Sequence, residues 1–123
     1  MLLVNSGGEK AAAEWQACFA KVKPELPVAY LDDPTVKDDA VNYVLVYNPR
    51  PGRLAQFQNL RLIISTGAGV DHITNDPDWP RHIPLVRMGN RQTSQRMSEY
   101  VCLSALCLLR EMRRIAIAQS NRR

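Results

Sequence analysis

The sequence has few cysteines and no long apolar segment, and both shortages narrow the class of protein. Its three cysteines, Cys18, Cys102 and Cys107, form no metal-type spacing, and their odd number argues against a disulfide framework. The most apolar stretch, residues 100–109, is about half as long as a membrane span. Residues 1–10 have neither the basic leader nor the long apolar core of a signal peptide. We therefore expect a cytoplasmic protein with free thiols, no metal site and no membrane partner.

Acidic residues are scarce in the last third of the chain. From residue 81 onward there are nine arginines but only two acidic residues, Glu99 and Glu111. A basic surface of this kind can bind nucleic acid. These arginines, however, are spread singly, without interleaved aromatic residues, a lysine cluster or a recognisable reader motif. We therefore expect a solvated helix face, or an interface with a missing neighbour, rather than a nucleic-acid partner.

What the sequence does contain is an alternation of short apolar runs with longer amphipathic or polar segments. This alternation is typical of repeated β-α units and a parallel sheet, and the length suffices for one domain. Residues 10–22 carry apolar side chains at helical spacing, and residues 54–57 can form a short helix. The predicted strands are residues 2–5, 28–31, 43–47, 60–65 and 84–87.

The longest helical pattern covers residues 94–118. Five apolar residues recur in it at spacings of three and four and share one face: Val101, Ala105, Leu108, Met112 and Ile115. Residues 102–109 are apolar almost all round, which predicts burial on more than one side. A continuous helix of about 25 residues would be about 37 Å long. Because that exceeds what covers a five-stranded sheet, we expect the helix to reach towards a further domain.

The segment most informative about function is STGAGVDHI, residues 65–73. It follows a predicted strand, at the carboxyl edge where open α/β sheets bind ligands. Gly67 and Gly69 let the backbone turn sharply and leave consecutive N–H groups unobstructed, and such a row of amides binds anions such as a carboxylate. The same glycines are equally compatible with a tight strand-to-helix turn alone. The residues by themselves leave both interpretations open.

A dinucleotide-binding fingerprint fits this segment poorly. GAGVDH has the first two glycines, but His72 stands where the third glycine would allow close helix packing. No acidic residue follows about 20 positions later to bind a ribose, because that neighbourhood is Met88-Gly89-Asn90. The segment also follows the fourth predicted strand, not the first. We therefore expect no cofactor-binding residue in this chain.

Neither histidine is expected to be catalytic. His72 adjoins Asp71, but sequence neighbours on a turn rarely face each other, so His72 is expected to hold the loop or meet solvent. Asp71 is expected to cap the turn or the next helix, and His82 to lie in an exposed loop. Trp15 and Trp79 are expected to be packing residues.

Two segments together resemble a known family. The run LRLIISTGAGVDHI, residues 60–73, and the run IPLVRMGNRQTSQRMSEYVCLSALCLLREMRR, residues 83–114, are similar to the amino-terminal domain of D-isomer-specific 2-hydroxyacid dehydrogenases. Within that family they resemble the glyoxylate/hydroxypyruvate reductase A branch, which the VYNP segment around Tyr47 also fits. The resemblance is strong from Tyr43 to Arg114 and loose before Ala40.

The resemblance implies a fold and a division of labour. The fold would be a flavodoxin-like, three-layer α/β sandwich with five parallel strands in the order 2-1-3-4-5, followed by a long carboxy-terminal crossover helix. Residues 1–123 would form an incomplete substrate-binding domain, and a nucleotide-binding Rossmann domain would follow residue 123. The parent protein would be a homodimer that uses NADH or NADPH to reduce glyoxylate or hydroxypyruvate, small 2-oxo acids, to 2-hydroxy acids.

The resemblance also implies which residues bind substrate. The amides of Ala68 and Gly69, with Val70 alongside, would hold the substrate carboxylate, Tyr47 would line the pocket, and Met97 would border the cleft. The family's catalytic arginine and its histidine-glutamate pair belong to the domain beyond residue 123, so no catalytic residue is expected here and the isolated chain should be inactive. The alternative is a non-enzymatic, flavodoxin-like binding or regulatory module, because a fold does not fix a function.

Overall fold

The computed structural model describes residues 1–121 of the chain. These residues fall into two units, Met1–Met88 and the unit that begins at Gly89, and each unit is described by itself.

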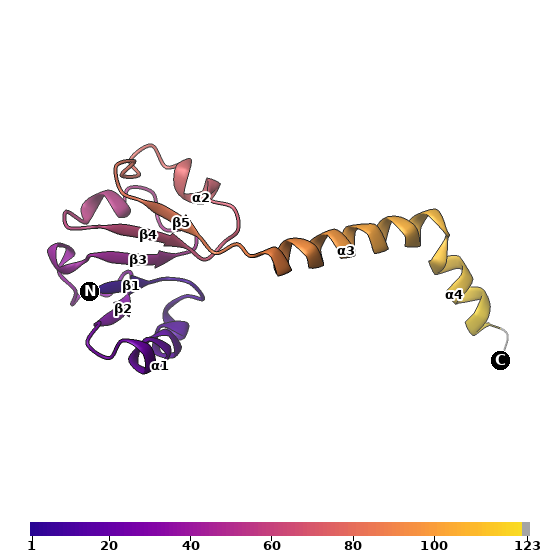
Figure 1. The fold of residues 1–123 in the computed structure, drawn as a ribbon, viewed down its shortest axis with the longest axis horizontal. Helices are drawn as coiled ribbons and strands as arrows, with labels where there is room; N and C mark the ends of the chain where they lie inside the picture. Colours follow the sequence, from indigo (N-terminus) through magenta and orange to yellow (C-terminus); the bar gives the residue numbers. More distant parts are fainter. Residues whose placement is uncertain (122–123) are drawn as a thin grey trace. The chain divides into compact units, whose positions relative to one another are not determined.

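The first unit is built on a five-stranded parallel sheet (Figure 1). Its strand order, β2-β1-β3-β4-β5, confirms the predicted order. The strands are each one or two residues shorter than predicted, because turns begin at both ends of the apolar runs. Their bounds are Leu2–Val4 for β1, Val28–Tyr30 for β2, Tyr43–Val46 for β3, Leu62–Ser65 for β4 and Leu85–Arg87 for β5.

Side chains on both faces of the sheet are buried. Successive residues of a strand point to opposite faces, so Val44 and Val46 lie on one face and Leu45 on the other. The Leu45 face packs against Trp15 and Phe19 of helix α1, Ala12–Val22. A strand buried on both faces explains why β3 is a continuous apolar run.

The opposite face is covered by short helical segments. These are the 3-10 turns η2, Asp38–Ala40, and η3, Leu54–Gln56, and the single-turn helix α2, Asp71–Thr74. Leu54, Phe57 and Ile73 pack there against Val44, Val46 and Ile63, with Trp79 at the margin. The first unit thus has three layers, as predicted, although one outer layer is made of short turns. The other predicted helix, residues 10–22, begins as the 3-10 turn η1, Glu9–Ala11, and continues as α1.

The second unit contains two helices, α3 and α4, instead of the single predicted helix over residues 94–118 (Figure 1). Helix α3, Arg91–Leu109, begins earlier than predicted because the Asn90 side chain caps it, accepting a hydrogen bond of 2.8 Å from the Thr93 N–H. The prediction of continuity is wrong because Glu111 has a φ of 48°, in the left-handed region, which ends α3. Helix α4, Met112–Ser120, follows.

The predicted burial of residues 102–109 is also wrong for this chain. No residue of α3 or α4 is buried by the part of the chain that the structure describes. The large apolar residues exposed on these helices include Leu103, Leu106, Leu108, Leu109, Met112 and Ile115. The sequence pattern correctly indicated an apolar helix, but its apolar side chains are not buried within residues 1–121.

Candidate functional site

The segment after β4 lies beside the residues that follow β1 and β3. The Tyr47 N–H donates to the side-chain oxygen of Asn5 over 2.7 Å, and the Asn5 N–H donates to the Leu45 carbonyl. The Ser6 hydroxyl donates to the Thr66 hydroxyl over 3.1 Å. Three loops at the carboxyl edge of the sheet are therefore joined to one another, at the edge where parallel sheets place their ligands.

Ser65, the last residue of β4, is the buried centre of this site. Its side chain is fully buried, and its Oγ accepts a hydrogen bond of 3.2 Å from the Gly67 N–H. The same Oγ lies 3.4 Å from the Gly67 carbonyl and 3.4 Å from the Gly69 carbonyl, which both accept from it. It also lies 3.3 Å from Nε2 of His72. In the tautomer that carries its proton on Nε2, His72 donates to the Ser65 Oγ. The Ser65 hydroxyl can then donate its own proton to the carbonyls of Gly67 and Gly69.

Arg87, the last residue of β5, donates a hydrogen bond to the Ala68 carbonyl, which lies in sequence between the carbonyls of Gly67 and Gly69. Its Nη1 donates to the Ala68 carbonyl over 3.1 Å. Ser65 and Arg87 are partners in the register of β4 and β5, so their side chains start from neighbouring positions at one edge of the sheet. The carbonyls of three successive residues, 67 to 69, are therefore each within hydrogen-bond distance of a side-chain donor.

Holding these carbonyls directs the amides that follow them. A trans peptide unit is planar, with its N–H pointing opposite to its C=O, and no peptide bond of the described residues is cis. The N–H groups of Ala68 and Val70 therefore point away from Ser65, and that of Gly69 points away from Arg87. Within residues 1–121 none of these three N–H groups donates to a protein acceptor. Such a row of open donors can bind an anion.

The two glycines of the loop have different steric roles. A Cβ on Gly67 would lie 3.2 Å from the Gly69 carbonyl oxygen, 3.3 Å from the His72 ring and 3.5 Å from the Tyr47 ring. A Cβ on Gly69 would meet nothing closer than a carboxylate oxygen of Asp71, at 3.9 Å. A side chain at Gly67 would therefore be tightly packed against its neighbours, whereas a side chain at Gly69 would have open space around its Cβ.

Tyr47 stands next to this loop. Its ring centroid lies 5.1 Å from that of His72, and 59% of its surface is exposed. Asn48, which follows it, has a φ of 51°, so the chain turns sharply as it leaves β3. The structure thus places the Tyr47 ring beside Gly67 and His72, which flank Ala68, Gly69 and Val70 in the loop.

Met97 belongs to the other unit of the chain. It lies on α3 in the second unit, with 60% of its surface exposed. Its place at the border of a cleft stays a prediction.

The remaining predicted residues are now accounted for. His72 contacts Ser65 and Tyr47 and so holds the loop, which is one of the two structural roles predicted for it. His82 is exposed, as predicted. The prediction that Asp71 is a cap is wrong: Val70 is the N-cap of α2, Asp71 is the first helical residue, and its side chain makes no capping hydrogen bond.

Sequence reasoning overlooked Asn5, Ser65 and Arg87 as site residues. Each is polar and either ends a strand or directly follows one. Because parallel strands all end at the same edge of the sheet, polar residues at strand ends were the available signal.

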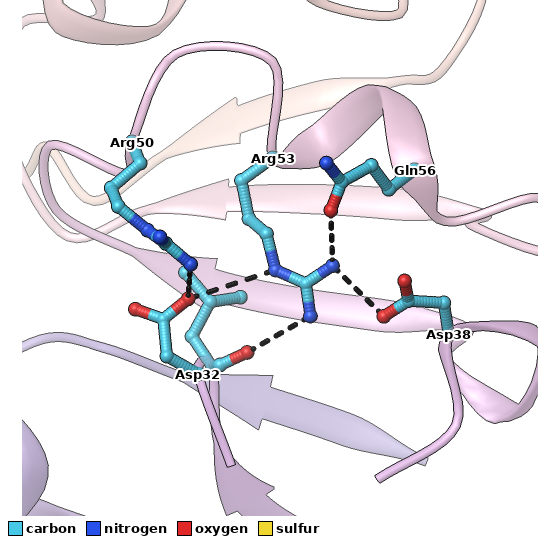
Figure 2. A network of polar contacts seen from close by, with 6 residues as sticks. Asp32, Asp38, Arg50, Arg53 and Gln56 are labelled. Carbon is cyan, nitrogen blue, oxygen red and sulfur yellow. Dashed lines mark hydrogen bonds and ion pairs between the residues drawn. The ribbon is translucent and has the colours of Figure 1, made fainter. Parts of the chain in front are cut away.

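A second polar cluster joins the loops that follow β2 and β3 (Figure 2). Arg53 donates to Gln56 and Asp38 from Nη1, at 2.7 and 2.8 Å, and its guanidinium lies over the Phe57 ring at 4.3 Å. Arg50 pairs with Asp32 at 2.7 Å. The charged groups are paired with one another, although the buried Nε of Arg53 makes no hydrogen bond and lies 3.7 Å from Asp32. The cluster therefore fastens the loop between β3 and β4.

Two other kinds of site were searched for in residues 1–121. They contain no group of three or more His, Cys, Asp or Glu side chains arranged to hold a metal ion. None of the helices described here is long and apolar enough to span a bilayer.

Comparison with known proteins gives a consistent result. No family model matches the chain. The glyoxylate/hydroxypyruvate reductase A of Enterobacter sp. (strain 638) is 34% identical over 74 residues, which are 56% of this chain and 23% of that protein. The chain thus spans about a quarter of the length of the curated relatives that it matches.

Solved structures match over nearly the whole chain. A D-isomer-specific 2-hydroxyacid dehydrogenase from Xanthobacter autotrophicus Py2, in complex with NADPH and MES, is 29% identical with a TM-score of 0.76 and covers 100% of this chain and 41% of its own. An NADPH-dependent glyoxylate/hydroxypyruvate reductase from Sinorhizobium meliloti, in complex with NADP and sulfate, is 30% identical with a TM-score of 0.69 and covers 98% and 38%. By sequence and by fold, this chain is similar to the amino-terminal part of D-isomer-specific 2-hydroxyacid dehydrogenases.

Proposed function

We propose that residues 1–123 are the substrate-binding part of a longer NAD(P)H-dependent oxidoreductase that reduces glyoxylate, hydroxypyruvate or a related small 2-oxo acid. The observation that carries this proposal is the row of open N–H groups at Ala68, Gly69 and Val70. The relatives that match the chain are reductases of these two acids, which gives the anion a chemical class.

The proposed role of the loop is to anchor the substrate carboxylate. Backbone amides carry partial positive charge and are small, so a carboxylate can approach Gly69 closely. The peptide groups that would bind the carboxylate carry no net charge. The carboxylate itself keeps the same charge throughout the reaction, because the bond that changes is that of the neighbouring ketone. The loop should therefore bind substrate and transition state about equally, which lowers KM and leaves kcat unchanged.

The reaction needs parts that this chain does not offer at the loop. Reduction of a 2-oxo acid requires a cation to polarise the ketone, a proton donor and a hydride source. His72, a titratable group that packs against the loop, is already engaged with Ser65 and Tyr47. We therefore assign the catalytic residues to the remainder of the longer protein and expect the isolated chain to be inactive.

The loop does not fit the nicotinamide cofactor. His72 packs where a dinucleotide loop needs a third glycine, α2 is a single turn, and the loop follows β4 and not β1. Cofactor binding accordingly belongs, in this proposal, to a nucleotide-binding domain outside this chain.

The exposed apolar side chains of α3 and α4 support the same proposal. Soluble proteins rarely leave a large apolar patch uncovered, and here it runs from Met97 to Ile117. We propose that the nucleotide-binding domain, or the second subunit of a homodimer, covers these side chains in the longer protein. A cytoplasmic location, expected from the free cysteines, belongs to the same proposal, as does the lack of a nucleic-acid partner.

The loop assignment can be tested in the complete protein with Gly69→Val. The branched side chain would stand in the anion's approach without crowding the loop, because a Cβ at Gly69 has room. We expect KM for glyoxylate to rise about tenfold or more, since loss of one charged hydrogen bond costs about 1.5–3 kcal/mol, while the Kd for NADPH stays the same. An unchanged KM would remove the loop from the substrate site.

The proposal that the cofactor is bound outside this chain can be tested separately. Titration of this isolated chain with NADH or NADPH, followed by nucleotide fluorescence, should show no binding. Clear micromolar affinity would contradict the proposal that the cofactor is held elsewhere.

A further inference from the structure

Arg87 has no role in the function proposed so far, yet it contacts the loop directly. Its Nη1 lies 3.1 Å from the Ala68 carbonyl oxygen. It is the last residue of β5 and pairs in register with Ser65, the buried centre of the loop. The described residues place no carboxylate within ion-pair distance of its guanidinium, so its charge is not neutralised by the chain.

The contact acts on one particular amide. The Ala68 carbonyl and the Gly69 N–H belong to the same planar peptide unit, so fixing the oxygen fixes the direction of the N–H. A guanidinium that donates to the oxygen also draws electron density from the peptide, which makes its N–H a stronger donor. Ser65 cannot do this for Gly69, because its hydroxyl serves the carbonyls of Gly67 and Gly69 instead.

The charge of Arg87 has a second effect. A guanidinium is a positively charged group. It therefore places one full positive charge a single peptide unit away from a row of amides that carry only partial charges. The stronger donor helps any hydrogen-bond acceptor, whereas the positive charge favours an anion over a neutral ligand of similar shape.

We propose that Arg87 is a positioning residue of the anion site: it aims the Gly69 N–H and raises the affinity of the loop for a carboxylate. This inference rests on the proposed function of the loop and adds to it a residue that sets how tightly the acid group is held. Arg87 acts through the Ala68–Gly69 peptide and needs no contact with the ligand.

The experiment compares Arg87→Gln with Arg87→Lys and with a matched control, Arg81→Gln. Arg81 is exposed and precedes β5, so its replacement removes the same charge near the opposite edge of the sheet. Glyoxylate is titrated into each protein at low ionic strength, and amide shifts of residues 68–70 are followed by ¹⁵N NMR. Glycolamide, which is neutral, is titrated in parallel.

For the unmodified chain we expect glyoxylate, and not glycolamide, to shift these amides. Arg87→Gln should raise the Kd for glyoxylate about three- to tenfold, as loss of a charge-assisted contact does, and should shift the Gly69 amide already in the free protein. Arg87→Lys, which keeps the charge, should recover part of the affinity. Arg81→Gln should leave Kd unchanged, and the unfolding midpoint should be the same in all variants because both arginines are exposed.

The outcomes separate the two proposals. If glyoxylate shifts no loop amide in the unmodified chain, the proposed function of the loop fails and this inference fails with it. If the unmodified chain responds and Arg87→Gln binds equally well, the anion site stands and the role of Arg87 is overturned. Equal weakening by Arg81→Gln would also overturn it, since charge alone would then explain the effect.

Discussion

The two units of this chain differ in whether they bury their apolar residues. Among residues 1–121, every buried apolar side chain lies between Leu2 and Ile73, on the sheet or on the segments that cover it. Helices α3 and α4 bury none, although their exposed apolar side chains are as large. A sheet covered on both faces can be stable by itself, whereas short helices gain most of their stability from packing. The difference teaches that the first unit has a core of its own, whereas the helices of the second unit have none within residues 1–121.

The largest expected difference between the two units is the cost in stability of truncating one leucine in each. Leu3 is fully buried in β1, so Leu3→Ala should lower the free energy of unfolding by about 2–5 kcal/mol. Leu106 on α3 is 56% exposed, so Leu106→Ala should change it by less than about 0.5 kcal/mol. Urea denaturation followed by the fluorescence of Trp15 and Trp79 measures both. Equal costs would mean that the second unit is packed within this chain after all.

Two serines sharpen the comparison at the level of hydrogen bonds. Within the described part of the chain, the Ser65 hydroxyl is the only acceptor of the Gly67 N–H, so Ser65→Ala leaves a half-buried donor unpaired and should cost about 1–3 kcal/mol. The Ser98 hydroxyl on α3 only donates to the carbonyl of Ser94 and is exposed, so Ser98→Ala should cost nearly nothing. The same denaturation measurement applies. If Ser65→Ala were as neutral as Ser98→Ala, Ser65 would not be what holds the loop.

Two glycines give the smallest difference. An added methyl at Gly67 would press on the Gly69 carbonyl at 3.2 Å, so Gly67→Ala should cost about 1 kcal/mol and disturb the open amides. Gly89, in the second unit, has open space around it, so Gly89→Ala should leave stability unchanged. Thermal unfolding measures the cost, and ¹⁵N chemical shifts of residues 68–70 measure the disturbance. Unaltered shifts in Gly67→Ala would show that the loop is not tightly packed.

Much of the fold was predictable because it depends on local pattern. The continuous apolar run of β3 indicated a strand buried on both faces, and the amphipathic segment that became α1 indicated a helix. The strand order came from the resemblance to a family. The break at Glu111 was not predictable, because glycine, the usual residue with a left-handed conformation after a helix, is absent there.

The candidate site was predictable only in part. The glycine-rich loop could be found from its position after a strand, but what aims its amides could not. The donor that holds the Ala68 carbonyl is Arg87, 19 residues later, and the acceptor that fixes the Tyr47 backbone is Asn5, 42 residues earlier. Such pairs exist only once the sheet order brings strand ends together. The role of Met97 depends on parts of the protein outside the first unit.

The most direct measurement of the central claim is a crystal structure of this chain, or of the complete protein, grown with glyoxylate. The account predicts carboxylate oxygens about 3 Å from the backbone nitrogens of residues 68–70, with the carbonyls of residues 67–69 still held by Ser65 and Arg87. A glyoxylate bound elsewhere, or a loop whose amides turn inward to protein acceptors, would contradict it.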